Sequence, residues 1–130
     1  DALRLAWAAL TRIVDSEGVT VMFGCSSFAG VGDEPHRDAL AMLACGHIGP
    51  VDQRPRRRAG ATVSLQAAPH DPKRALGQMP PLLRSYLAMG GWVSDHAVLD
   101  PDLDTLHVFT AVEIAAIPPV RARLLRLDAR

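Results

Sequence analysis

Apolar residues recur at steps of three and four at the start of the chain and predict an amphipathic helix over residues 1–16. The apolar face of this helix holds Leu3, Trp7, Leu10, Ile13 and Val14. Gly18 follows at the position where a left-handed residue commonly ends a helix. Residues 19–23 are β-branched and apolar without a helical period, so we expect a strand that is buried on both faces of a sheet.

The rest of the chain continues this alternation of helices and strands. We expect helices that begin at Asp33, Asp71, Pro80 and Pro118, and strands over residues 61–65, 92–99 and 105–114. Small residues between positions 24 and 30 allow the backbone to bend and to approach a ligand closely. Prolines and arginines over residues 49–60 predict an exposed basic loop. The order of elements and their short connections indicate the α/β class.

The composition is that of one globular domain. The chain has 130 residues, of which 48% are hydrophobic, and its 14 basic residues balance 14 acidic ones. A balanced charge gives no general affinity for nucleic acid, so we expect no nucleic-acid partner. The longest apolar run, residues 39–45, is far shorter than the ~20 residues of a transmembrane helix. No signal segment precedes the first predicted helix, and we expect a cytoplasmic location.

The cysteines and histidines do not form a recognisable metal or disulfide pattern. Cys25 and Cys45 are too few for a disulfide framework, and their apolar neighbours predict buried, reduced thiols. The five histidines form no HxH or HExxH pattern, and Cys45 and His47 have no second pair at zinc-finger spacing. We therefore expect no metal site.

Two stretches of the chain resemble a known enzyme family. Residues 21–30, VMFGCSSFAG, are similar to the F-G-C-A-S-F-x-G motif of the ornithine lipid N-acyltransferases, bacterial enzymes with the GNAT acyltransferase fold. Residues 80–100, PPLLRSYLAMGGWVSDHAVLD, resemble the P-P-L-x-x-x-Y-L-x-x-G-x-x-V-x-D-x-A-v-x-D block of the same family. The two motifs follow in the order and at the separation found in that family, and the resemblance extends over most of the chain.

The resemblance implies a reaction and its substrates. A 3-hydroxyacyl chain passes from acyl carrier protein to the α-amino group of ornithine, which gives a lyso-ornithine lipid. The acyl group arrives on the phosphopantetheine of acyl carrier protein, or on coenzyme A, and no other cofactor is implied. Two alternatives stay open. One is a GNAT-type enzyme with another amine acceptor, such as a relative of the homoserine-lactone synthases, and the other is a non-catalytic half-fold that binds another chain through an edge strand.

The resemblance also implies an architecture. In the GNAT fold, two neighbouring parallel strands splay apart and the acyl-pantetheine arm inserts between them, and residues 19–25 correspond to the second strand. The first strand, and the turn that holds the pantetheine phosphate at a helix N-terminus, are expected before Asp1. Residues 1–130 are then the carboxy-terminal portion of one GNAT-like α/β domain that has a mixed sheet with helices on both faces and lacks its amino-terminal half. We expect this portion to be inactive alone, and to self-associate or pair with the missing half.

On the donor side, the resemblance implies contacts of the acyl-pantetheine with Phe23, Gly24, Cys25 and Ser26. Backbone amides around Gly24 are candidates for stabilising the oxyanion that develops on the thioester carbonyl. Ser26 or Ser27 is a candidate for protonating the leaving thiolate. His36, in the first turn of a predicted helix, is a candidate base because a helix N-terminus favours neutral imidazole. The alternative is that the small residues only end a strand.

On the acceptor side, two aspartates and two histidines are candidates. Ornithine carries two ammonium groups, which Asp95 and Asp100 are suited to hold. One of these carboxylates, or His96 or His107, is a candidate for accepting the amine proton through a water molecule. The family usually has aspartate where this sequence has His107. A solvated turn with capping aspartates is the alternative.

Four arginines of the predicted loop form a candidate docking surface: Arg54, Arg56, Arg57 and Arg58. Acyl carrier proteins are strongly acidic, and arginine suits both phosphate and carboxylate. The same cluster is suited to anionic lipid headgroups, which would give peripheral contact with the inner membrane. The alternative is that these four arginines are solvated charges of an exposed loop and bind no partner.

Overall fold

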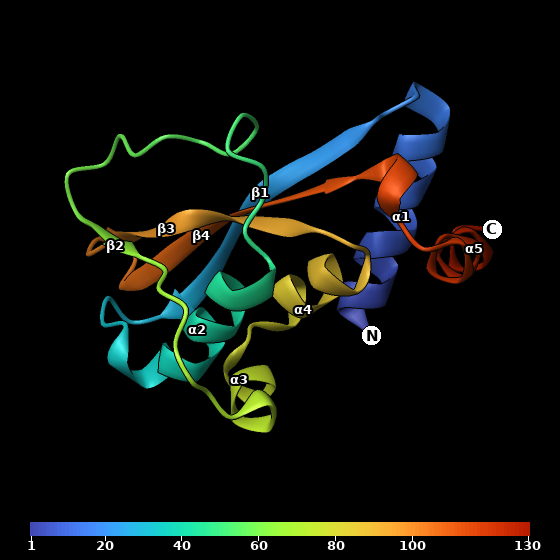
Figure 1. Cartoon of the computed structure of the whole chain (residues 1–130). Coiled ribbons are helices and arrows are strands. Elements are labelled where there is room, and N and C mark those ends of the chain that lie inside the picture. Colours follow the sequence, from blue (N-terminus) through green and yellow to red (C-terminus); the bar gives the residue numbers. More distant parts are fainter.

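A four-stranded sheet forms the centre of the computed structural model, which describes residues 1–130 (Figure 1). The strands are β1 (Val21–Ala29), β2 (Thr62–Ser64), β3 (Trp92–Asp100) and β4 (Thr105–Glu113), in the order β1-β4-β3-β2. Every neighbouring pair is antiparallel, and Ile48 adds one isolated parallel bridge to Val93. The predicted α/β class is confirmed.

Five helices accompany the sheet: α1 (Ala2–Glu17), α2 (Arg37–Gly46), α3 (Pro72–Gln78), α4 (Pro81–Ala88) and α5 (Pro119–Asp128). Single 3-10 turns over Glu34–His36 and Ile114–Ala116 precede α2 and α5. The predicted limits of the first helix are confirmed, because the carboxylate of Asp1 accepts from the amide of Leu3 and Gly18 ends the helix at φ 65°. None of the helices is long and apolar enough to cross a membrane.

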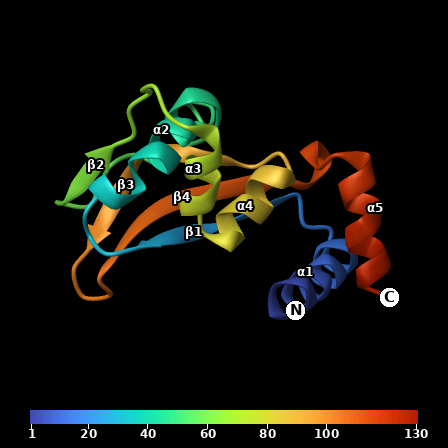
Figure 2. The ribbon, with the colours of Figure 1, turned by 90° about the horizontal axis from the view of Figure 1, so that it is seen from below.

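The core lies between one face of the sheet and the helices, as the view from below shows for α2, α3 and α4 (Figure 2). Its largest cluster joins Phe28 of β1, Leu43 of α2, Leu83 of α4 and Val108 of β4, all of which are almost completely buried. A smaller cluster attaches α1 through Trp7, which meets the ring of Tyr86 edge-on at 5.4 Å between centroids. Both clusters use the same face of the sheet.

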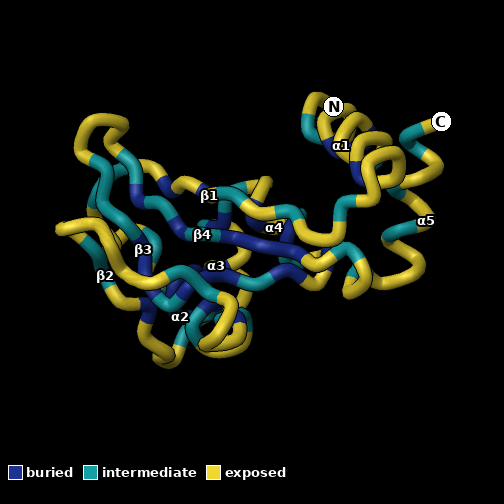
Figure 3. Tube along the Cα trace, turned by 90° about the horizontal axis from the view of Figure 1, so that it is seen from above, coloured by how far each residue is buried: buried dark blue, intermediate teal, exposed yellow.

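The other face of the sheet carries no helix, and this differs from the expectation of helices on both faces. The segment of residues 49–60 arches over part of this open face (Figure 1), and much of that segment is exposed (Figure 3). The predicted burial of the first strand on both faces is therefore wrong. Side chains of β1 alternate, so that Phe28 is buried whereas Phe23 is 70% exposed. The predicted burial of both cysteines is also wrong, because Cys25 points to the open face and Cys45 is exposed on α2.

β1 is an edge strand, and half of its backbone groups have no partner in the sheet. The amide of Gly30 donates to the carbonyl of Asp104 at 2.7 Å, and the amide of Ile114 donates to the carbonyl of Thr20 at 2.8 Å. Because the register with β4 is unbroken, the even-numbered residues of β1 are the ones that bond to β4. The amides that point away from the sheet are those of Val21, Phe23, Cys25, Ser27 and Ala29.

We expect this chain to self-associate in solution through the unpaired edge of β1. Replacing Phe23 by lysine places a charge on the edge strand, and the mass measured by light scattering should then fall toward that of the monomer. Leu103→Lys is the matched control, because Leu103 is 67% exposed but lies in a turn away from the edge. A wild-type mass of 14.0 kDa at every concentration tested would contradict the expectation.

Candidate functional site

A hollow of about 450 Å³ lies on the open face of the sheet, beneath the segment of residues 49–60. We call it the open-face hollow. Three strands and the overlying segment contribute its walls: Cys25, Pro55, Arg56, Arg58, Ala59, Ser94, His96, Val98, His107 and Phe109. The hollow thus brings together residues of both motifs found in the sequence.

A bulge in β3 shapes one wall of the open-face hollow. Val93 pairs with Thr110 and Ala97 pairs with Val108, so β3 holds two more residues than β4 over this stretch. The extra length re-aims the side chains of the bulge, as bulges beside functional sites often do. His96 lines the hollow, whereas Asp95 reaches toward the segment above. The hydroxyl of Ser94 stabilises the bulge by donating to the carbonyl of His96 at 2.8 Å.

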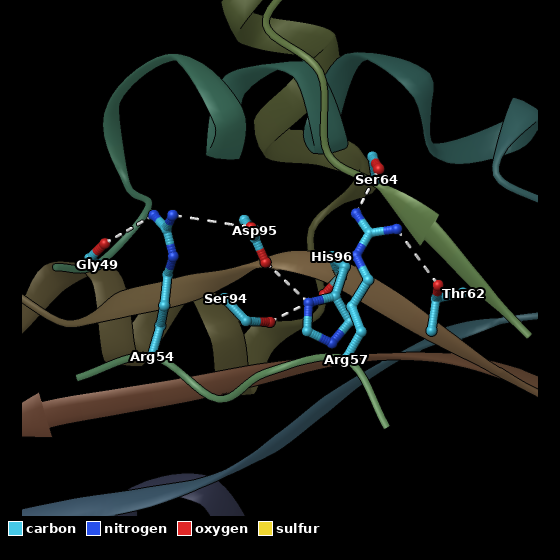
Figure 4. A network of polar contacts seen from close by, with 8 residues as sticks. All are labelled: Gly49, Arg54, Arg57, Thr62, Ser64, Ser94, Asp95 and His96. Carbon is cyan, nitrogen blue, oxygen red and sulfur yellow. Dashed lines mark hydrogen bonds and ion pairs between the residues drawn. The ribbon is translucent and has the colours of Figure 1, made fainter. Parts of the chain in front are cut away.

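Asp95 and His96 form a carboxylate–imidazole pair (Figure 4). His96 Nδ1 lies 2.8 Å from Asp95 Oδ1, and the His96 side chain is 6% exposed. The hydrogen bond from His96, followed by the nearby charge of Arg54, lowers the pKa of Asp95 below its ordinary value. Since the carboxylate accepts, Nδ1 carries the hydrogen, and in the neutral imidazole Nε2 is left as an acceptor.

A second row of polar groups crosses from β1 to the β3–β4 turn. Ser27 Oγ lies 2.8 Å from His107 Nδ1, and His107 Nε2 lies 3.0 Å from Asp100 Oδ2. Thr105 Oγ1 is also 3.0 Å from Nε2. The hydrogen bond from His107, then that from the amide of Leu103, lowers the pKa of Asp100. With Nε2–H donating to Asp100, Nδ1 of neutral His107 accepts the hydroxyl hydrogen of Ser27, which is the arrangement of a serine–histidine–aspartate triad.

Aromatic side chains extend the open-face hollow along the sheet. The ring of Phe109 lies 5.8 Å from Phe23 and 5.8 Å from Trp92, measured between centroids. These three side chains line a second depression of about 470 Å³, and Phe109 is shared with the open-face hollow. The open face thus offers one polar and one apolar region side by side.

Ser26 and His36 are not brought to the open-face hollow. Ser26 is buried on the helix-covered face, where its hydroxyl lies 3.5 Å from Thr110 Oγ1. His36 donates from Nε2 to the carbonyl of Ala29 at 2.8 Å, and its ring lies 4.9 Å from that of Phe28. The neighbouring Ser27 is the serine whose hydroxyl contacts a histidine. Its side chain points to the opposite face from that of Ser26 because successive residues of a strand alternate between the two faces.

The four arginines of the loop divide into two pairs with different contacts. Arg54 donates to the carbonyl of Gly49 at 3.1 Å and forms an ion pair of 3.8 Å with Asp95, and Arg57 donates to the hydroxyls of Ser64 and Thr62 (Figure 4). Arg56 and Arg58 line the open-face hollow instead. The structure contains no cluster of three or more histidine, cysteine, aspartate or glutamate side chains suited to a metal ion.

Most of the chain is similar to curated enzymes of one kind. It is 32% identical over 117 residues to L-ornithine N(alpha)-acyltransferase of Rhodobacter capsulatus, and 34% identical over 116 residues to that of Brucella abortus. The four curated relatives that match most of the chain are all L-ornithine N(alpha)-acyltransferases. The enzyme of Rhizobium meliloti is 30% identical over 118 residues.

The chain spans less than half the length of these acyltransferases. The three matches cover 86% to 89% of the chain and 40% to 45% of the relatives. No family model matches the sequence, and no solved structure matches it.

Replacing Asp95 by asparagine should lower the free energy of unfolding by about 1 kcal/mol near neutral pH, because it weakens a charged hydrogen bond that is partly solvated. The folded-state pKa of Asp95 is depressed, so this stability is present above its ordinary pKa of 3.8 and is lost as pH falls through the folded value. Denaturant titrations at pH values from about 7 down to about 2 would measure the difference between variant and wild type. Asp52→Asn is the control, because Asp52 is an exposed carboxylate of the segment of residues 49–60. A difference for Asp95→Asn that stays constant in acid would contradict the expectation.

Proposed function

We propose that this chain provides the acceptor side of an N-acyltransferase that moves a 3-hydroxyacyl chain from acyl carrier protein to the α-amino group of ornithine. One observation carries the proposal. The unpaired amides of the β1 edge lie beside Ser27, whose hydroxyl meets the His107–Asp100 pair. Amide formation from a thioester needs both oxyanion donors and a route for the amine proton, and these groups are of the kinds required.

The acyl donor lies along the free edge of β1 in this proposal. The outward amides of Cys25 and Ser27 donate to the oxyanion that forms on the thioester carbonyl. Phe23, Trp92 and Phe109 offer an apolar surface for the acyl chain. A strand from elsewhere in the protein completes the other side of this binding groove, so this chain alone is expected to be inactive.

The acceptor occupies the open-face hollow with its carboxylate toward Arg56 and Arg58. This revises the role expected for the aspartates, because Asp95 and Asp100 are already hydrogen-bonded to histidines. Two guanidinium groups and two imidazoles line the hollow, and such a wall favours an anionic group over an ammonium group. The α-amino group then points toward β1 and the thioester.

The proton of the amine travels along Ser27 and His107. As the ammonium gives a proton to Ser27 Oγ, the hydroxyl passes its own proton to His107 Nδ1, and Asp100 stabilises the resulting imidazolium. The amine nitrogen forms a bond with the carbonyl carbon, the carbon–sulfur bond breaks, and the thiolate takes a proton back from the same row. The nitrogen loses a second proton to solvent water as the amide forms, so of the two protons that leave the ammonium the thiolate takes one and water takes the other.

A product assay tests the proposal. The full polypeptide that contains this chain is incubated with 3-hydroxyacyl carrier protein and a panel of amino acids, and the products are identified by mass spectrometry. Acylated ornithine is the expected product. If homoserine or another amine is acylated and ornithine is not, the acceptor assignment fails. If nothing is acylated and another segment instead pairs with β1, the chain is an assembly module.

A further inference from the structure

The exposed face of α5 carries an apolar stripe. Val120, Leu124 and Leu127 are 64%, 53% and 50% exposed. Successive residues of a helix are ~100° apart, so these three positions fall along one line of the helix surface. The view from above shows α5 at the side of the molecule, with most of its length exposed (Figure 3).

The opposite face of α5 is attached firmly to α1. Ala122 and Leu125 line an apolar cavity of about 200 Å³ together with Trp7. Two ion pairs join the helices, one of 2.6 Å between Arg4 and Asp128 and one of 3.1 Å between Arg126 and Asp15. Arg12 also donates to the carbonyl of Ala129 at 2.6 Å. These contacts fix the rotation of α5, so the apolar stripe faces away from the rest of the chain.

Positive charges flank the stripe on both sides. Arg121 lies on one side of it and Arg123 on the other, and Arg130 follows directly after the helix. None of these three guanidinium groups is within ion-pair distance of a carboxylate, whereas the one acidic residue of the helix, Asp128, is neutralised by Arg4. The apolar stripe and its flanking arginines are complementary to a surface that has anionic groups on the outside and apolar groups beneath them. The apolar stems of the arginines can cover apolar groups while their charged ends reach outward.

We propose that α5 is a docking helix for the surface of an anionic lipid bilayer, with Val120, Leu124 and Leu127 inserted among the headgroups. The loop arginines, which the sequence analysis gave as one candidate for such a contact, are less available. Arg54 and Arg57 hold the segment of residues 49–60 to the sheet, and Arg56 and Arg58 line the open-face hollow. The docking helix lies at the other end of the sheet from β2 (Figure 1), and this inference does not depend on the acylation reaction.

Vesicle co-sedimentation tests the docking helix. The chain should bind vesicles made from equal parts of phosphatidylcholine and phosphatidylglycerol at least about tenfold more tightly than vesicles of phosphatidylcholine alone. High salt should weaken the binding to the anionic vesicles. The pair Leu124→Ser and Leu127→Ser should lower this binding by about tenfold or more, and the pair Arg121→Gln and Arg123→Gln should remove the preference for anionic lipid.

The matched control is the pair Leu76→Ser and Leu103→Ser, two exposed leucines that lie outside α5. These substitutions should leave vesicle binding unchanged, and circular dichroism confirms that each variant is folded. Equal binding to both kinds of vesicle, or an equal loss in the control, overturns the proposal. So does a result in which the α5 variants change the mass measured by light scattering but not vesicle binding, because a second copy then covers the stripe. Absence of binding by the full polypeptide overturns it as well, because another segment then covers the stripe.

Discussion

Replacing His107 by glutamine is expected to lower the rate constant of acyl transfer by about a hundredfold in the full polypeptide, the smaller end of the range for loss of a general base. Glutamine keeps hydrogen-bonding groups near Ser27 and Asp100 but cannot take up a proton. The rate of thiol release from 3-hydroxyacyl carrier protein, measured across pH, checks this. The variant should release the thiol about a hundredfold more slowly than the wild type at each pH tested.

Four further variants separate proton transfer from packing. His70→Gln is the matched control, because His70 contacts only the carbonyl of Ala68 in a loop. Ser27→Ala should cost nearly as much as His107→Gln, and the double variant little more, because residues that act as a unit are not additive. His107→Asp restores the residue that the resemblance implies for the family, keeps a proton acceptor beside Ser27, and should retain more activity than glutamine. A full rate for His107→Gln would contradict the proposed proton path.

Replacing Gly91 by alanine is expected to lower the free energy of unfolding by about 3 kcal/mol, near the top of the range for overpacking. A β-carbon at this position would lie 2.7 Å from the carbonyl oxygen of Tyr86 and 2.8 Å from that of Ala111. Both are backbone atoms of packed elements, and neither can move without shifting α4 or β4. Denaturant titration of the purified chain measures the change.

Gly77→Ala is the matched control for this substitution. Gly77 lies inside α3, and a β-carbon there meets nothing within 4 Å. Alanine at an open helical position should stabilise the chain by about 0.5–1 kcal/mol. The same chemical change therefore has opposite expected signs at the two sites. Equal effects at both positions would show that the contacts at Gly91 relax easily.

Local patterns were enough to predict the helices and the main strands. The three- and four-residue spacing of α1 and the glycine at position 18 identify that helix and its end, because both depend on residues close in sequence. Local patterns could not predict that one face of the sheet carries no helix. A short apolar strand looks alike whether one or both of its faces are covered, and Phe23 is exposed because no helix happens to pack above it.

The candidate site could be predicted only in part from the sequence, because its contacts depend on how distant strands pair. Ser27 and His107 are 80 positions apart, and their contact depends on the register between β1 and β4. Alternation along a strand puts the hydroxyls of Ser26 and Ser27 on opposite faces, but only the register shows that Ser27 is the one that meets His107. Residues 92–99 alternate well enough for a regular strand, which would place Asp95 with Val93 and Ala97 on the helix-covered face, so the bulge that turns Asp95 toward Arg54 had no local indication.

The bulge in β3 has a consequence for how this family can diversify. It adds two residues, an even number, so the side chains before Ser94 and after His96 keep the same faces that a straight strand would give them. Deleting or gaining the pair in one genetic event would therefore keep the faces of the flanking strand while removing or adding side chains that line the open-face hollow. In the proposed reaction, that single change of length alters which amine fits the hollow and leaves Ser27 on β1 and His107 on β4 in place.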